Sequence, residues 1–425
     1  MKHTVHEHRL ASGAQGLVVN VPGSAVVNVR VSFRSGFQYS DPETYEVPHI
    51  MEHLLATVTK RHAEPNAFMI DVQKNGAYGN ASTSADTNDY IYEFANFELD
   101  RIMDLIEEQV SEPLFANESF VAEKSNVREE LTRNTTQHMS VCTIKLSEQA
   151  FPKQWKGYEE RIAQLDAIKL EQLESHYYST HTARNARFYV SGDFADGGKE
   201  VAARFERIFA RLSPGKRLEP VRDRGLRVEE PIVTQRDIEQ VYYRTGRFFG
   251  ELNVSQQAAL GLLRMLLVGG MGSRVLGEAR RRGLAYSVGA TAYSEPGNST
   301  FGFTGYVTPP NAGALYEVIS RNLRQVGSGE ATIDELEAAK NLLVGSITRS
   351  TQTAGDVLNW YIDRYDEADE IRDFDVELAR LQTVTLDEIT QVTQMILETN
   401  NTGLSLLGRI NDQAVGVYAQ LLNFA

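Results

Sequence analysis

The sequence predicts an α+β protein made of two homologous α/β-sandwich domains, a duplicated unit joined by a linker. The chain has 425 residues, and at roughly 100–200 residues per domain this length suits two domains. Residues 213–232 are rich in proline, glycine and charge, which interrupts the apolar periodicity and is typical of a linker. We therefore predict an N-terminal domain at 1–212 and a homologous C-terminal domain at 233–425.

The duplication is suggested by two segments, residues 165–194 and residues 381–410, which align without a gap. Leu170 matches Leu386 in this alignment. Few positions are identical, so chance similarity is the alternative. The shared order of a capped helix, a turn and an apolar strand favours a duplicated unit.

Strands and helices are both expected in the N-terminal half. Residues 24–36 alternate apolar and polar side chains, as in a half-buried strand. Residues 78–94 contain two strand-like runs around a polar turn. Residues 97–113 and 117–134 repeat apolar side chains at helical spacing, and the first of these helices is expected to stop before Pro113. Strand pairs followed by helix pairs predict an α+β sandwich.

The composition argues against several classes of protein. The net charge is −14 and the sequence has no basic stripe, so we do not expect a nucleic-acid partner. A single cysteine, Cys142, excludes a disulfide framework and a cysteine-rich zinc site. The N-terminal segment is polar. The most apolar segment is interrupted by Arg264 and is shorter than the about 20 residues of a membrane span. We expect a cytoplasmic protein without a membrane partner.

The segment EVPHIMEHLLATV at residues 46–58 carries the clearest chemical signal. Pro48 suits the first turn of a helix, where its missing N–H is not needed. His49 and His53 are four positions apart, so both imidazoles project from one helix face and suit a divalent metal. Glu52 lies beside this pair, where a carboxylate is able to take a proton from water at the metal. The alternative is a polar helix face without a ligand.

A hydrolytic zinc site also needs a third protein ligand and an open position for water. The helix predicted at 117–134 offers three carboxylates, Glu123, Glu129 and Glu130. Glu123 and Glu130 are seven positions apart and share one face, whereas Glu129 is turned about 100° from Glu130. Spacing alone does not rank Glu123 against Glu130.

Several motifs in combination resemble one peptidase family. HIMEH is followed, 77 positions after its last histidine, by Glu130 in VREEL. GAYGNASTSADTNDY, QWKGYEERIAQLDAI and GGMGSRVLGEARRRGLAYSV follow in that order along the chain. Together they resemble the pitrilysin/insulinase family of zinc metallopeptidases, which carries the inverted zinc motif, and its half-size, processing-peptidase-like branch. The resemblance covers nearly the whole chain.

This resemblance implies the roles of the metal-site residues. His49, His53 and Glu130 would be the ligands of one Zn²⁺ per chain. Glu52 would be the general base, and Glu123 would be a supporting carboxylate near the metal. The implied activity is that of a zinc metalloendopeptidase.

The resemblance also implies where a peptide substrate binds. In the family an exposed edge strand next to the zinc accepts the peptide as an added strand, a mode that reads backbone more than side chains. In this sequence that strand contains four matching residues, Asn80, Ala81, Ser82 and Thr83. A purely structural strand is the alternative.

The second half contains an arginine and a tyrosine that match a substrate-holding pair of the family. They are Arg280 and Tyr286. The segment is one residue shorter than the spacing associated with the family, so Arg281 is an alternative to Arg280. A solvated basic turn without a function is the other alternative.

The resemblance also bears on assembly. Larger family members join two such units, with the zinc in the first unit and the arginine–tyrosine pair in the second. This chain is one unit that carries both features, so we expect a homodimer in which each site combines zinc from one chain with Tyr286 of the other. A heterodimer with a paralogous subunit is the alternative, and a non-catalytic assembly subunit is the competing function.

Overall fold

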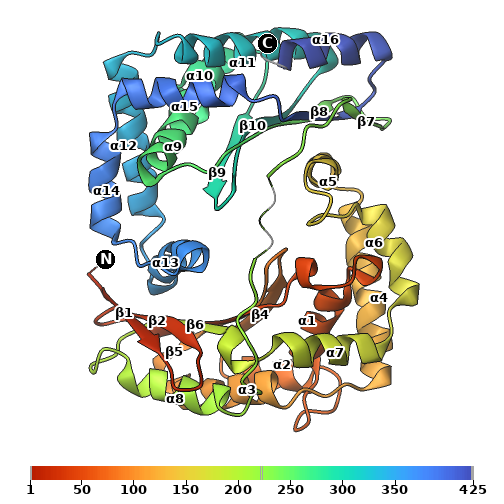
Figure 1. The fold of residues 1–425 in the computed structure, drawn as a ribbon, viewed down its shortest axis with the longest axis vertical. Coiled ribbons are helices and arrows are strands. Elements are labelled where there is room, and N and C mark those ends of the chain that lie inside the picture. The colour runs from red at the N-terminus through yellow and green to blue at the C-terminus, as the bar shows by residue number, and fades with distance from the viewer. Residues whose placement is uncertain (1, 221, 223, 423–425) are drawn as a thin grey trace. The chain divides into compact units, whose positions relative to one another are not determined.

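The computed structural model describes residues 2–220, 222 and 224–422, and these form two compact units. Unit 1 comprises Met1–Arg133, Tyr158–Val221 and Ser350–Asp369, and unit 2 comprises Asn134–Gly157, Arg222–Arg349 and Glu370–Ala425. Each unit has its own mixed β-sheet with helices packed on it (Figure 1). The predicted α+β class with two sandwich domains is confirmed.

The sheet of unit 1 has six strands in the order β1-β2-β6-β3-β5-β4. The strands are β1 (Thr4–Arg9), β2 (Gln15–Asn20), β3 (Val26–Arg34), β4 (Tyr78–Thr83), β5 (Thr87–Ala95) and β6 (Ala186–Gly192). Neighbours are antiparallel except β2 and β6, which are parallel. β3 buries Val27, Val29 and Val31 in alternation, as its sequence predicts. β4 forms the edge of this sheet.

The helices of unit 1 cover both faces of its sheet. They are α1 (Val47–Thr57), α2 (Ala67–Gln73), α3 (Leu99–Ser111), α4 (Asn117–Asn134), α6 (Tyr158–Gln164), α7 (Leu170–Thr180), α8 (Lys199–Phe209) and α13 (Ala354–Ala368). Figure 1 shows α3 and α8 on one side of the sheet and α13 on the other. α13 packs against β2, β3 and β6, and α1 packs against β4, α7 and α2. The sheet is therefore the middle layer of this unit.

The sheet of unit 2 has five strands in the order β7-β11-β8-β10-β9. The strands are β7 (Ile232–Gln235), β8 (Val241–Phe249), β9 (Val288–Glu295), β10 (Asn298–Val307) and β11 (Thr402–Gly408). The helices are α5 (His138–Ala150), α9 (Val254–Val268), α10 (Arg274–Arg281), α11 (Pro309–Gly327), α12 (Ile333–Arg349), α14 (Phe374–Thr383), α15 (Leu386–Glu398) and α16 (Asp412–Leu422). α9, α11 and α15 enclose one large apolar core, and α5 packs against β8 and β11.

The two units repeat the same plan. In both sheets a parallel pair, β2 with β6 or β7 with β11, is followed by three antiparallel neighbours in matching order. The aligned sequence segments form matching elements, because α7 begins at Leu170 and α15 begins at Leu386. Both are followed by a seven-residue strand, β6 and β11. The duplication predicted from the sequence is present in the fold.

The boundaries of the units differ from the predicted domains at two segments. Residues 134–157, which include α5, belong to unit 2 although they lie within 1–212. Residues 350–369, which include α13, belong to unit 1 although they lie within 233–425. Each sheet thus receives one covering helix from the half of the chain that forms the other unit. A linker prediction based on local composition does not detect this exchange.

The predicted linker is also bonded to the units along much of its length. The backbone N–H groups of Ala183 and Arg184 donate to the carbonyls of Ser213 and Pro214. In unit 2 the Val228 N–H donates to the Thr402 carbonyl. The described parts of residues 213–232 are therefore largely loop segments that are hydrogen-bonded to neighbouring elements.

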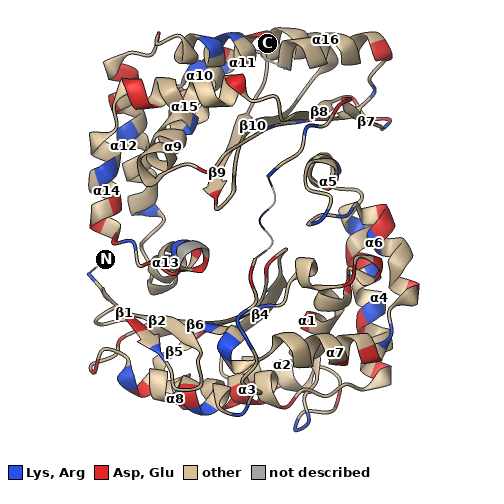
Figure 2. Ribbon diagram, in the orientation of Figure 1, with Lys and Arg blue, Asp and Glu red and all other residues tan. Residues whose placement is uncertain are grey.

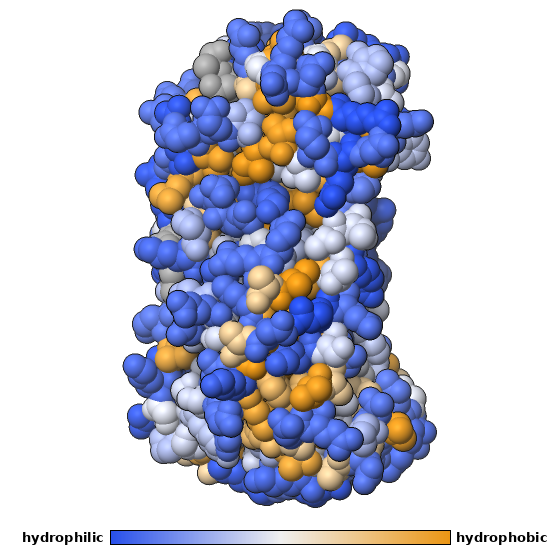
Figure 3. All heavy atoms as spheres, turned by 90° about the vertical axis from the view of Figure 1, so that its right-hand side faces the viewer, coloured by the Kyte–Doolittle hydropathy of each residue, from blue (hydrophilic) through white to orange (hydrophobic). Residues whose placement is uncertain are grey.

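The outer helices carry charges of both signs. Figure 2 shows acidic and basic residues interspersed along α4 and α6. Figure 3 shows hydrophilic residues over most of the face that carries these helices, with separate hydrophobic areas between them. α4 buries one stripe of residues, Phe120, Glu123, Val127 and Leu131, and this stripe holds it against unit 1. Among the described helices, none has both the length and the apolar composition needed to cross a membrane.

Candidate metal centre

The HIMEH segment lies on α1, close to its N-terminus. Pro48 occupies the first turn. The helix is buried on nearly every side, and its buried side chains include Ile50, Met51, Leu54 and Leu55. Because these side chains anchor α1 between β4 and its neighbouring helices, the helix is held rigidly. His49 and His53 therefore project from a fixed backbone, and their rings meet edge to face with centroids 4.9 Å apart.

The carboxylate of Glu130, on α4, faces both imidazoles. Its Oε2 lies 3.7 Å from His49 Nε2 and 3.8 Å from His53 Nε2. One ligand atom from each of the three residues lies within 4.8 Å of the others. A tetrahedral zinc with bonds of about 2.0–2.1 Å holds two ligand atoms roughly 3.4 Å apart. The donor set of two nitrogens and one oxygen therefore fits a zinc ion.

The other ring nitrogen of His49 is held by a buried carboxylate. Glu46 Oε2 lies 2.9 Å from His49 Nδ1, and Arg161 donates from Nε to Glu46 Oε1 at 2.5 Å. Burial opposes the charge of Glu46, but Arg161 and His49 outweigh it and lower its pKa. The ionised carboxylate accepts a hydrogen bond from Nδ1–H. This tautomer leaves Nε2 of His49 free to bind a metal.

Arg161 is itself fixed by aromatic rings. Its guanidinium carbon lies 4.9 Å from the ring centre of Phe37, 5.5 Å from that of Tyr45 and 5.7 Å from that of Tyr158. The side chain is 7% exposed. Cation–π contacts and the Glu46 carboxylate together offset the cost of burying this charge.

His53 has an equivalent arrangement with Glu123. Glu123 Oε2 lies 3.1 Å from His53 Nδ1, and the same carboxylate accepts hydrogen bonds from Thr57 and Asn126 at 3.0 Å each. Glu123 therefore holds the tautomer of His53 from behind, whereas Glu130 faces the Nε2 atoms. The geometry separates the two carboxylates that helical spacing left unranked. Glu129 is exposed and belongs to neither group.

The electrostatics of the cluster favour a cation. Burial opposes the charged form of His53, but the hydrogen bond to Glu123 and the nearby carboxylate of Glu130 outweigh it and raise the pKa of His53 to about 10. The interaction with His53 is the main reason that the pKa of Glu130 falls to about 2. The carboxylates thus create a strongly negative environment around the two Nε2 atoms, as a divalent metal requires.

Glu52 is on the same helix but makes different contacts. It is 7% exposed, and its Oε2 accepts a hydrogen bond from Thr83 Oγ1 at 2.6 Å. Burial raises the pKa of Glu52, although His49 and Thr83 oppose this shift. The side chain is directed to β4, so it is free of the ligand set and has the environment of a general base.

The four predicted substrate-binding residues all lie on the edge strand β4. β4 pairs with β5 on one side, with Asn80 opposite Ile91 and Ser82 opposite Asp89. Asn80 and Ser82 are exposed, whereas Ala81 and Thr83 are partly buried. Thr83 connects the strand to Glu52, a contact that the sequence does not reveal.

The predicted arginine–tyrosine pair lies in unit 2, in and after α10. The guanidinium of Arg280 stacks 4.3 Å above the ring centre of Tyr286, and its Nη1 donates to the Tyr286 carbonyl at 3.2 Å. Tyr286 is 75% exposed. The geometry pairs Arg280 with Tyr286, whereas Arg281 is exposed on the following helical position.

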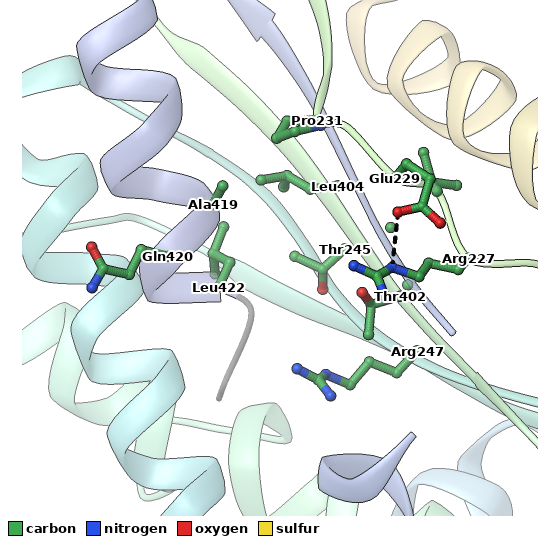
Figure 4. A pocket seen from close by; sticks show the side chains of 13 residues that line it. Arg227, Glu229, Pro231, Thr245, Arg247, Thr402, Leu404, Ala419, Gln420 and Leu422 are labelled. Atoms are coloured by element: carbon green, nitrogen blue, oxygen red, sulfur yellow. Dashed lines mark ion pairs between the residues drawn. The ribbon is translucent and has the colours of Figure 1, made fainter. Parts of the chain in front are cut away.

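A separate cavity in unit 2 has a different character. It has a volume of about 210 Å³ and is lined in part by Leu404, Ala419 and Leu422 (Figure 4). Among the described residues that line it, Glu229 is the one acid, and it pairs with Arg227 at 3.3 Å. This cavity offers no set of metal donors comparable to the cluster on α1 and α4.

The sequence-based prediction did not include several contributors to the site, among them Glu46, Arg161 and Asn88. Glu46 precedes His49 by three positions, so helical spacing provides a usable signal for it. Arg161 and Asn88 lie far from the motif in sequence, and only the fold brings them to it.

Two family models match most of the chain. Residues 17–160 match the insulinase family, described as peptidase family M16, and residues 167–343 match the domain described as the peptidase M16 inactive domain. The chain belongs to the insulinase family. The insulinase-family match at 17–160 contains the cluster on α1 and α4. In unit 2, α9 holds the equivalent place between β8 and β9, and its sequence has no histidine or carboxylate.

Relatives of the insulinase family support the same assignment. An uncharacterized zinc protease of Streptomyces coelicolor is 25% identical over 429 residues, covering 96% of this chain and 91% of that protein. The crystal structure of a protease from Helicobacter pylori has a TM-score of 0.83 at 20% identity, covering 96% of this chain and all of that one. A peptidase M16 inactive domain from Pseudomonas fluorescens has a TM-score of 0.83 at 16% identity, with 96% and 98% covered. The latter two show likeness of fold.

Proposed function

We propose that this protein is a zinc-dependent endopeptidase. The observation that carries the proposal is the complete cluster on α1 and α4. His49 and His53 direct their Nε2 atoms to Glu130, while both Nδ1 atoms are held by other carboxylates. The names of the relatives, which describe zinc proteases, support zinc as the metal.

The residues of the chain divide the chemical work. His49, His53 and Glu130 would hold one zinc ion, which when bound lowers the pKa of water and polarises a carbonyl. Glu52 would accept the proton of the attacking water and later deliver it to the leaving amine. Its burial keeps its basicity above that of an exposed glutamate. These roles require Glu52 to be near the metal without binding it, as its bond to Thr83 supports.

We propose that the substrate is a peptide or an unfolded segment bound along β4. The strand forms the edge of its sheet, and Asn80 and Ser82 are exposed on it. An extended peptide is able to add to such an edge through backbone hydrogen bonds. Thr83, at the end of β4, is bonded to Glu52, so a peptide on this strand passes close to the base.

We also propose a homodimer in which Tyr286 and Arg280 of one chain serve the site of the other. The exposure of Tyr286, 75%, supports a role in contact with another molecule. Arg280 would orient the tyrosine through the stacking contact. A heterodimer with a paralogous chain remains the alternative assembly, and the cytoplasmic location stays a prediction.

The proposed activity is tested with fluorogenic peptides and a zinc assay on the purified full chain. We expect about one zinc per chain, loss of cleavage with a chelator and recovery with zinc. Glu52→Gln should keep its zinc and lose about 10²–10⁴-fold in kcat, because general acid–base catalysis supplies this factor. Glu129→Gln is the matched control, since Glu129 is exposed beside Glu130.

Two results would contradict the proposal. The first is a protein that binds zinc but cleaves no member of a broad peptide panel, which would indicate the non-catalytic subunit. The second is near-normal cleavage by Glu52→Gln.

A further inference from the structure

A chain of hydrogen bonds connects Glu52 to the buried interior of unit 1. Thr83 Oγ1 donates to Glu52 Oε2 at 2.6 Å, and Asn88 Nδ2 donates to Thr83 Oγ1 at 2.6 Å. Ser35 Oγ donates to Asn88 Oδ1 at 2.5 Å. Ser35 and Asn88 are both fully buried. We propose that Ser35, Asn88 and Thr83 are positioning residues that fix the carboxylate of Glu52 for proton transfer.

The direction of each bond follows from the chemistry of the groups. An ionised carboxylate only accepts hydrogen bonds, so the single hydroxyl proton of Thr83 must go to Glu52. Thr83 then has only lone pairs for Asn88, which must present its NH₂ group. The carbonyl oxygen of Asn88 consequently faces Ser35, which donates to it. One orientation satisfies all four groups.

The amide of Asn88 has little freedom to adopt another orientation. Its second N–H points to the Pro48 carbonyl at 3.4 Å, one residue before the metal-site residue His49. Ser35 is fixed in turn, because its carbonyl accepts a hydrogen bond from His176 Nε2 at 2.9 Å. Asn88 thereby ties β5 to the edge strand β4 and to the first turn of α1. A buried amide with all its groups bonded is a rigid support.

This arrangement assigns Thr83 a role other than the predicted binding of substrate. Its hydroxyl is engaged with Glu52 and Asn88, so its side chain does not serve the peptide. Proton transfer depends steeply on the position of the base, and a displacement of about 1 Å can cost about 10²-fold in rate. Loss of the Thr83 hydroxyl should therefore reduce kcat more than it changes KM.

The proposal rests on the proposed peptidase function, and the principal test compares substitutions at Thr83. Thr83→Val keeps the shape and removes the hydroxyl, and we expect kcat to fall by about 10- to 100-fold. KM should stay within about threefold, as expected when ground-state binding is retained. Zinc content should match that of the wild type. Thr83→Ser keeps the hydroxyl and should recover most of the lost kcat.

Two further variants distinguish the proposed positioning of Glu52 from a general effect on the sheet. In Asn88→Asp the new carboxylate oxygen accepts the Thr83 proton, so Glu52 loses its donor and kcat should fall as in Thr83→Val. Thr87→Val removes a hydroxyl from the neighbouring strand β5, where its partners are Ser84 and Asp89, and should leave kcat unchanged.

The proposed positioning role is overturned if Thr83→Val retains the kcat of the wild type. It is also overturned if Thr83→Ser is as impaired as Thr83→Val, or if the loss of kcat is matched by a loss of zinc.

A stability measurement separates failure of the proposed positioning role from failure of the proposed peptidase function. If the wild type cleaves no peptide, the proposed function is wrong, and thermal unfolding of the full chain still tests the contact. Thr83→Val should lower Tm by about 2 °C or more beyond its effect in a Glu52→Ala background, because the two residues interact. If the Tm shifts of Thr83→Val and Glu52→Ala simply add in the double variant, the two side chains do not interact and the proposed hydrogen bond is wrong.

Discussion

Glu46→Gln should lower both the free energy of unfolding and the affinity for zinc. Glu46 is fully buried between His49 Nδ1 and Arg161 Nε. The substitution keeps the shape and removes the charge. A glutamine that still accepts from Arg161 must turn its NH₂ group to His49. It then donates to Nδ1 and favours the tautomer that carries the proton on Nε2, the nitrogen that faces Glu130.

Two effects should follow, and each has a magnitude. Breaking one side of a buried ion pair costs about 3–5 kcal/mol, and a retained neutral hydrogen bond returns about 1 kcal/mol. We therefore expect the free energy of unfolding to fall by about 2–4 kcal/mol. Loss of the carboxylate behind a metal-binding histidine typically weakens metal affinity about 10–100-fold.

The assays are urea unfolding of the metal-free protein and competition for zinc against a chelator of known affinity. Glu43→Gln is the control, because Glu43 is an exposed acid three positions earlier in the chain. It should behave as the wild type in both assays. If Glu46→Gln keeps both the wild-type stability and the wild-type zinc affinity, the role assigned to Glu46 is wrong.

Three other predictions follow from the structure. His53→Ala should abolish tight zinc binding, since two remaining ligands rarely hold zinc, and stoichiometric zinc in this variant would refute the ligand set. Burial raises the pKa of Asp366, on α13, to about 6. At Asp366 the folded state thus binds more protons than the unfolded chain between about pH 4 and 6, so the contribution of this group to the free energy of unfolding should fall as pH rises through this range. Asp366→Asn should remove this contribution, so the difference in unfolding free energy between wild type and variant should change across this range in urea titrations, and a constant difference would contradict it. Mixing Glu52→Gln with Tyr286→Phe under subunit exchange should restore activity if sites are shared between chains, and no recovery despite exchange would exclude sharing.

The repeated fold could be predicted because apolar periodicity reports local burial. Residues 165–194 and 381–410 showed the same pattern, and they form α7 with β6 and α15 with β11. The exchange of α5 and α13 between the units could not be predicted. An amphipathic helix reveals that one face is buried but not which sheet buries it, and that choice depends on the tertiary fold.

The candidate site was predictable where its residues share one helix. His49, Glu52 and His53 follow from spacing on α1. Spacing did not rank Glu123 against Glu130, and only the family resemblance implied that Glu130 is the ligand; in the structure Glu123 contacts Nδ1 of His53 and Glu130 faces its Nε2. The supports of the site come from distant segments. Arg161 reaches Glu46 across 115 positions, a contact that no local pattern encodes.

The central claim is that His49, His53 and Glu130 bind one zinc ion. Anomalous diffraction at the zinc absorption edge, on crystals of the zinc-loaded protein, tests it most directly. We predict one strong peak per chain within bonding distance, about 2.0–2.2 Å, of the two Nε2 atoms and the Glu130 carboxylate. A zinc-loaded protein with no peak there, or with its peak at other residues, would contradict the claim.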